Sequence, residues 1–479
     1  MKSICFTFAV SALLTVGVGV IPEVSARPML VQIHIRGLSG LGAGLIQPQS
    51  LDTSTGEFVW AKGMHHFLEA GKSQVPYMNQ GSQKGPLYFN KFLVYADSIA
   101  DDLCVVTGAR QSGVIRDQYH EAVTLSSSPD THVPLVYGFN ARVSEMHQKN
   151  LLSLAVPHDL SALYHGYDFR HGVQAWAPSV ANFASYTNVS DVRYEQESGQ
   201  KKPVDQIFEH HLGEHYATWL QGKPYLTPWW HVRQQLLGFD SRAVVDDFNQ
   251  EKDYDLAQKQ SLRFDKTHWR AWFSEQDANL LLGSHPAMVD NLAATLTLLK
   301  LGHFSSVLID LEYPHQNARA GAADVLQTRD AASLWHGIAT FWKEVKSLGL
   351  DREVLVMVTT DNSGGYYGHN TFARTRYSAV DLTEPLNRGT GKLFSMALLN
   401  GRLAAPCKLG AVLDGFIPAP TKNIAGEPLL GEPAYTQLEV TGRLLMRLFP
   451  SYFGDVDTVR RYWPSFTVDK NIPSMVGGI

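Results

Sequence analysis

Acidic and imidazole side chains follow two segments of this sequence, 305–309 and 354–358, which end in apolar residues and have the pattern of buried strands. Carboxylate oxygens and imidazole nitrogens are the ligands that divalent ions of hard to borderline character take. A metal held by such groups can activate a water molecule or polarise a phosphoryl or sulfuryl oxygen. The residues therefore predict a divalent metal site, without distinguishing zinc, calcium and magnesium. The predicted ligands are Asp310, Glu312, His315, Asp361 and His369.

A third segment, 116–128, carries further groups that could do chemistry. Arg116 would clamp an anion, His120 would act as a base, and the serine run 126–128 would supply a hydroxyl.

The elements that must position these groups alternate between helix and short buried strand. This alternation predicts a layered α/β fold, in which βαβ units form a parallel sheet with helices on both faces. Ligands bind at the carboxyl ends of the strands in such sheets, so we expect the two acidic loops to converge from neighbouring strands. The predicted strands are 29–35, 103–108, 305–310 and 354–359, and the predicted helices are 91–99, 286–301 and 331–348.

Composition places the chain among folded globular proteins. Its 479 residues are 44% hydrophobic, which is enough for a large core. With 41 Lys and Arg against 46 Asp and Glu, the net charge of -5 removes the electrostatic basis for a general nucleic-acid binder. We expect one α/β unit over 27–479 with a mostly helical insertion at about 186–277, and a tail after Pro450 that packs on the surface.

The first 26 residues have the features of a secretory signal peptide. Lys2 precedes the apolar run 4–21, and the small-residue sequence Val24-Ser25-Ala26 predicts cleavage after Ala26. An uncleaved membrane anchor is the alternative; no later segment is apolar enough to span a bilayer. The mature chain is therefore expected in a periplasm or outside the cell, with no stable membrane span. It keeps Cys104 and Cys407, for which separate buried thiols are the simpler expectation, with pairing left open.

A different metal motif, His211-Leu212-Gly213-Glu214-His215, fits the H-x-x-E-H pattern of a class of zinc peptidases. A predicted helix between Pro203 and Gly222 would point both histidines to one face. Gly213 costs about 1 kcal/mol inside a helix, and the sequence identifies no third ligand. The zinc peptidase is the third of three functional hypotheses.

The order of the α/β segments resembles that of a large group of exported bacterial proteins, domain-of-unknown-function family 1501. This family is placed in the alkaline-phosphatase and sulfatase-like superfamily. The resemblance covers most of the mature chain and rests on the order of the segments. The similar segments are 31–42 (the family's opening strand and Arg-Gly-Gly-x-Asp-Gly loop), 103–108 (second strand), 116–122 (Arg-Ser-His), 307–317 (strand and Asp-Thr-His loop), 354–365 (strand and Ser-Glu-Phe-Gly-Arg loop), and 389–403 with 436–448 (C-terminal part).

The chain also departs from the family's pattern. Ser39 stands in place of the family's first Asp, and Tyr313-Pro314-His315 in place of Asp-Thr-His. Thr360-Asp361-Asn362 replaces Ser-Glu-Phe, the Gly-Thr-Asp-His-Gly motif is shortened to Gly389-Thr390-Gly391, and the family's twin-arginine signal is absent. By analogy with the wider superfamily, Asp310 with His315, Asp361 and His369 would rebuild part of a two-metal site.

The resemblance implies an alkaline-phosphatase-like fold and a secreted, metal-assisted hydrolase of phosphate or sulfate esters, with a small molecule or a polymer as substrate. In that reading Asp361 is catalytic, His120 is the base or an anion contact, and Ser127 or a water molecule attacks. The alternative is a degenerate relative that binds a ligand, glycan or partner without turnover. It would use the aromatic residues Trp229-Trp230 and Tyr366-Tyr367, because a fold can persist after its site is lost.

Overall fold

A computed structural model describes most of the predicted α/β body. The described residues are 27–36, 49–51, 58–60, 82–89, 93–110, 133–156, 172–177, 179–180, 241–265, 268, 285–312, 323–360, 393–413 and 417–477. The predicted signal peptide, the His211–His215 motif and the aromatic pairs at 229–230 and 366–367 lie outside them.

An eight-stranded sheet forms the centre of the molecule. Every neighbouring pair is parallel except at β11, which is antiparallel to both of its neighbours. The predicted α/β fold class is therefore confirmed. In spatial order the strands are β12 (Cys407–Leu409), β6 (Leu103–Arg110), β11 (Leu393–Leu399), β10 (Val354–Thr360), β1 (Met29–Arg36), β9 (Phe304–Glu312), β7 (Leu152–Val156) and β8 (Val173–Trp176).

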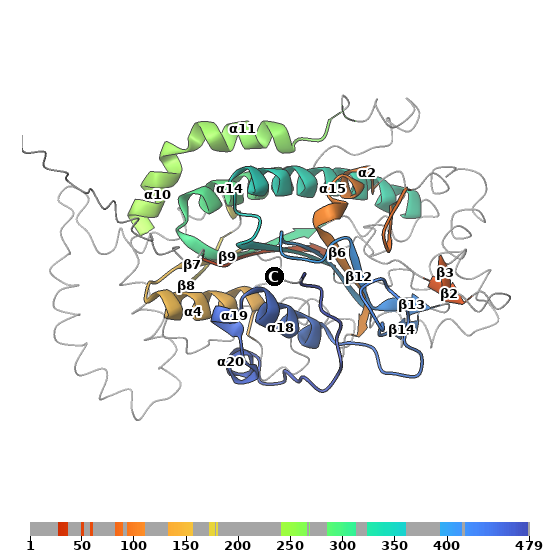
Figure 1. Cartoon of the computed structure of the whole chain (residues 1–479). Helices are drawn as coiled ribbons and strands as arrows, with labels where there is room; N and C mark the ends of the chain where they lie inside the picture. Colours follow the sequence, from red (N-terminus) through yellow and green to blue (C-terminus); the bar gives the residue numbers. More distant parts are fainter. Residues whose placement is uncertain are drawn as a thin grey trace, which may run out of the picture.

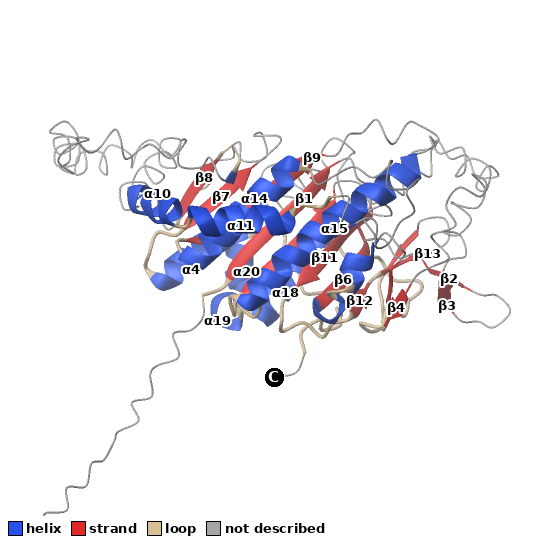
Figure 2. Ribbon diagram, turned by 90° about the horizontal axis from the view of Figure 1, so that it is seen from above, coloured by secondary structure: helices blue, strands red, loops and turns tan. Residues whose placement is uncertain are grey.

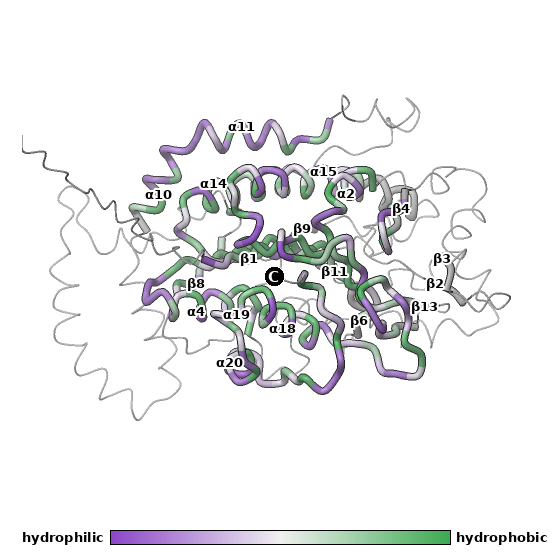
Figure 3. Tube along the Cα trace, in the orientation of Figure 1, coloured by the Kyte–Doolittle hydropathy of each residue, from purple (hydrophilic) through white to green (hydrophobic). Residues whose placement is uncertain are grey.

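Helices cover both faces of this sheet, as predicted (Figures 1 and 2). On one face lie α14 (Pro286–Leu301) and α15 (Ala323–Ser347). The other face is covered by α4 (Leu135–His147) and α18 (Gln437–Leu448). Each face has its own hydrophobic core, and the strands between them are apolar along most of their length (Figure 3).

Local sequence signals account for the helix boundaries. Pro286 occupies the first turn of α14, where a missing N–H has no cost, and Gly302 ends the helix in the left-handed conformation at φ 68°. Thr436 and Glu439 form a reciprocal capping box at the start of α18. The predicted helix 91–99 is shorter than expected, because only α2 (Val94–Asp97) and the 3-10 turn Ala100–Asp102 form.

Two helices from the predicted insertion are described, and they form an outer layer over α14 (Figure 1). These are α10 (Ser241–Gln250) and α11 (Lys252–Leu262). Val244 and Leu262 point into the core shared with α14 and α15. The boundaries of the insertion stay a prediction, since most of 186–277 lies outside the described residues. Three short antiparallel pairs complete the described strands: β2 (Gln49–Leu51) with β3 (Phe58–Trp60), β4 (Ser82–Lys84) with β5 (Leu87–Phe89), and β13 (Ala411–Leu413) with β14 (Ile417–Ala419).

The segment after Pro450 is part of the core, so the prediction of a surface tail is wrong. It forms α19 (Pro450–Phe453) and α20 (Val456–Tyr462). Phe453, Trp463 and Phe466 are fully or almost fully buried beneath α4 and α18. Two short helices cannot show a helical period over a long window, but their aromatic side chains supply the apolar surface that covers this face.

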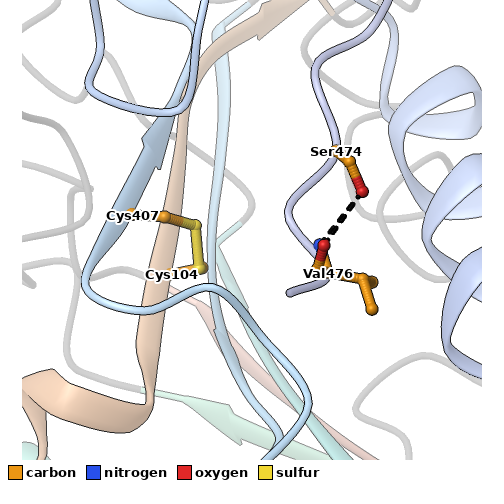
Figure 4. The surroundings of a disulfide bond; sticks show 4 residues. All are labelled: Cys104, Cys407, Ser474 and Val476. Carbon is orange, nitrogen blue, oxygen red and sulfur yellow. Dashed lines mark hydrogen bonds between the residues drawn. A yellow bond between two sulfur atoms is a disulfide. The ribbon is translucent and has the colours of Figure 1, made fainter. Parts of the chain in front are cut away.

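Cys104 and Cys407 form a disulfide, which corrects the expectation of separate thiols. The two residues are partners in the register of β6 and β12, and their Cα atoms are 4.5 Å apart. The bond attaches the three-residue edge strand β12 to the sheet (Figure 4). The C-terminal segment near Ser474 and Val476 bridges back to the chain just before β12, through Leu403 and Val476. The two cysteines are 303 residues apart, so no local sequence pattern indicated that they pair.

Lys408, next to the disulfide, is a lysine with no exposed surface. Its backbone N–H donates to the carbonyl of Ile424, and its side-chain stem packs against Gly426, where a Cβ would come within 2.8 Å of Cδ. Burial lowers the pKa of Lys408 to about 7. A group that is neutral in the folded chain and charged in the unfolded chain links stability to pH.

Removing the disulfide is expected to destabilise the protein. The Cys104→Ser, Cys407→Ser double variant should lower the free energy of unfolding by about 2–5 kcal/mol, because the unfolded chain loses a covalent constraint across a long loop. Chemical unfolding of the mature protein in its oxidised form checks this result. A thiol titration of the unfolded mature chain should find no free thiol, and finding two would contradict the pairing.

The stability of the wild-type protein should rise with pH because of Lys408. Between the folded pKa of about 7 and the unfolded value of 10.5, the unfolded state binds one more proton at this residue. Relative to Lys408→Met, the wild type should therefore gain about 1.4 kcal/mol per pH unit in this window and nothing below it. Urea unfolding of both proteins at pH 6, 7, 8 and 9 measures the difference. A difference that is constant from pH 7 to 9 would mean that Lys408 is charged in the folded protein.

Candidate functional site

Three polar side chains lie in register across the central strands β9, β1 and β10. His34 of β1 pairs with Asp310 of β9 on one side and with Thr359 of β10 on the other. All three strands are parallel, and each of these residues lies within two residues of the carboxyl end of its strand. This is the sheet edge at which open α/β proteins place their ligands.

The three side chains share one face of the sheet. Side chains alternate along a strand, and Leu30, Leu308 and Leu355, each an even number of residues away, belong to the core under α4 and α18. His34, Asp310 and Thr359 therefore point to that same face.

The imidazole of His34 is held from the β10 side. Its Nδ1 lies 2.9 Å from Oγ1 of Thr359, and both residues are fully buried. Asp310, the neighbour of His34 on β9, is partly buried. This contact between His34 and Thr359 orients the ring, and the hydroxyl can accept the Nδ1–H of the tautomer whose lone pair is on Nε2.

The structure tests only part of the predicted metal site. Asp310 lies at the predicted sheet edge, and Glu312 ends β9 opposite Arg36 of β1, with its side chain outside the described part. The other predicted site residues lie outside the described residues: His120, Ser127, His315, Asp361 and His369.

One geometric expectation needs correction. The loops after β9 and β10 do not follow neighbouring strands, because β1 lies between β9 and β10 in the sheet. The two strands are nevertheless parallel, so both loops leave from the same edge. The carboxyl end of β1, which carries His34, lies between the carboxyl ends of β9 and β10.

His34 is the residue that sequence reasoning missed. The alternation over 29–35 places it at a polar position, which is typical of a strand with one solvated face. In the sheet, β1 has neighbours on both sides and helices over both faces, so Gln32 and His34 are fully buried. The sequence feature that could have identified His34 is an imidazole near the carboxyl end of a strand whose other residues are mostly apolar.

The chemistry of this donor pair fits a divalent metal. A carboxylate and a neutral imidazole are ligands for zinc and related ions. A ligating histidine commonly donates its second ring N–H to an oxygen, and Thr359 is placed to accept it. Across the described ranges, no three histidine, cysteine or acidic side chains gather as a metal site requires. In the described part of the edge, His34 and Asp310 are the two candidate donors.

A second imidazole cluster packs the segment after α11 onto the body. His336 of α15 lies edge-on to Tyr95 at 4.9 Å and to His268 at 4.7 Å, with Phe264 at 5.3 Å. Burial lowers the pKa of His336 to about 4, so its ring is neutral at physiological pH. The four rings pack against one another, so we assign this cluster a packing role.

Comparison with known proteins leaves the family of this chain open. No known family model matches it, and no curated protein is significantly similar to it in sequence. Among the described helices, none combines the length and the apolar composition needed to cross a membrane.

Solved structures show distant similarities. One is the lipoteichoic acid synthase LtaP from Listeria monocytogenes, at 8% identity over 82% of this chain and 70% of that protein. Another is a protein of the alkaline phosphatase superfamily from Vibrio parahaemolyticus, at 10% identity over 85% of this chain and 70% of that protein. A third is Ps i-CgsB in complex with k-i-k-neocarrahexaose, at 9% identity over 81% of this chain and 69% of that protein. The TM-score is 0.29 for each, which is too low to assign this chain to any of them.

Proposed function

We propose that this protein is an exported, metal-assisted hydrolase of phosphate or sulfate esters, with its centre at the carboxyl edge of β1, β9 and β10. The observation that carries the proposal is the pairing of the partly exposed Asp310 with the fully buried His34 at that edge. A partly buried carboxylate beside a fully buried imidazole is unusual in strands that are apolar along most of their length. The resemblance in segment order to family 1501 supports the same reaction class.

Asp310 would hold the metal together with Glu312, His315, Asp361 and His369. A divalent ion at this position supplies Lewis-acid polarisation of the ester's phosphoryl or sulfuryl oxygen. Arg116 and His120 would bind the anionic group and orient it. Ser127 or a water molecule would attack the phosphorus or sulfur atom, with His120 taking the proton of the attacking hydroxyl, while the bond to the leaving alcohol oxygen breaks.

Export is part of the proposal, and one observation supports it. The Cys104–Cys407 disulfide is typical of proteins that fold in oxidising compartments.

An ester panel with matched variants tests the proposal. Purified mature protein is assayed on 4-nitrophenyl phosphate, bis(4-nitrophenyl) phosphate and 4-nitrophenyl sulfate, with added zinc, calcium, magnesium or manganese. Asp310→Asn and Asp361→Asn should each lower the rate on the preferred ester at least about 100-fold, because each removes a charged metal ligand. A chelator should abolish the rate, and the metal should restore it.

Asp457→Asn is the control, since it makes the same charge change at an exposed position on α20, away from the sheet edge. It should keep the wild-type rate, and thermal unfolding should show all three variants folded. Full activity in Asp310→Asn, or a rate unaffected by chelation, would contradict the proposed centre. No turnover of any ester, with saturable binding of a glycan, would favour the binding protein instead.

A further inference from the structure

The central strand β1 contributes an imidazole where packing alone would take an aliphatic side chain. The other residues of β1 from Met29 to Ile35 are apolar, apart from Gln32, and all are buried. A polar ring in such a position has a desolvation cost that must be offset by specific partners. The hydrogen bond between Nδ1 of His34 and Oγ1 of Thr359 is one such partner.

The position of that ring relative to Asp310 favours a shared ligand. His34 and Asp310 are direct partners in a parallel pair and point to the same face. Neighbouring strands lie about 4.8 Å apart, so their side chains can reach one ion between them.

Thr359 lies on β10, on the other side of β1 from Asp310, and holds the ring of His34 from there. When its Oγ1 accepts the Nδ1–H of His34, the neutral ring carries its lone pair on Nε2. That is the tautomer that binds a metal, and a hydrogen bond from the second nitrogen is the usual way of holding a ligating histidine.

We propose that His34 is a metal ligand through Nε2, and that Thr359 is the positioning residue that sets its ring. This inference rests on the proposed function, because it places an additional ligand in the same centre. It differs from the ligand set expected from the sequence, in which the first strand contributes none. The first strand would thus supply an imidazole nitrogen inside the sheet, while the Asp expected in the loop after it is replaced by Ser39.

Metal binding by matched variants tests this proposal without any assay of turnover. Metal-free mature protein is titrated with zinc, and bound metal per chain is measured after dialysis by elemental analysis. His34→Gln should weaken zinc affinity at least about 100-fold, since it removes a ligand. Thr359→Val should weaken it about 10- to 100-fold, and Thr359→Ser, which keeps the hydroxyl, should restore affinity close to that of the wild type. Cobalt substitution should give a visible spectrum that shifts in His34→Gln.

His147→Gln is the matched control. His147 is also hydrogen-bonded to a hydroxyl, with Nε2 2.8 Å from the Tyr452 oxygen, but it is exposed and ends α4 at the opposite edge of the sheet. It should bind zinc as the wild type does. If His34→Gln does not fold, as thermal unfolding would show, the Thr359 pair carries the test.

The outcomes separate this inference from the proposed function. If Asp310→Asn loses zinc while His34→Gln and Thr359→Val keep it, the centre is real and His34 has only a packing role, which overturns the inference. If Asp310→Asn keeps zinc, or the wild type binds none, the proposed centre itself fails and the inference with it.

Discussion

Strand β1 is hydrogen-bonded along its length to β9 on one side and to β10 on the other, and helices cover both of its faces. The apolar composition of the central strands and the position of the candidate site both depend on this burial of β1. It makes the strands apolar, because each side chain must pack in one of the two cores. It also makes any polar residue near their carboxyl ends costly to place, so the few that occur there mark the candidate site.

The same enclosure explains how much of the fold could be predicted. Runs such as 354–358 are apolar on every residue, and a short run of this kind between helices indicates a parallel strand buried on both faces. Helix α14 is bounded by Pro286 and Gly302, which are local signals, and its observed limits match the predicted ones. These features are determined by residues close together in the sequence, so local patterns were sufficient to predict them.

Features that depend on distant parts of the chain could not be predicted in this way. The place of β1 between β9 and β10 brings together residues 276 and 325 positions apart, and no local pattern encodes that order. The Cys104–Cys407 bond and the burial of Trp463 beneath α4 have the same origin. His34 was missed for this reason too: its strand was predicted, but whether its polar side would meet solvent depended on the strand's neighbours.

The candidate site is therefore defined by a non-local constraint acting on a few polar residues. Asp310 was predicted from its position after a strand, and His34 and Thr359 emerge only when the sheet is assembled. The predicted ligands His315, Asp361 and His369 follow the strands that flank β1, so their loops leave from the edge where the described pair lies. A centre built there would take one ligand from the buried ring of His34 and one from the partly buried carboxylate of Asp310.

The most direct test of this centre is the anomalous scattering of crystals of the mature protein grown with zinc. We predict one strong peak at the carboxyl edge of β1 and β9, about 2.0–2.2 Å from a carboxylate oxygen of Asp310 and about 2.0–2.1 Å from Nε2 of His34. A peak between His211 and His215, or no peak in crystals that contain zinc, would contradict it.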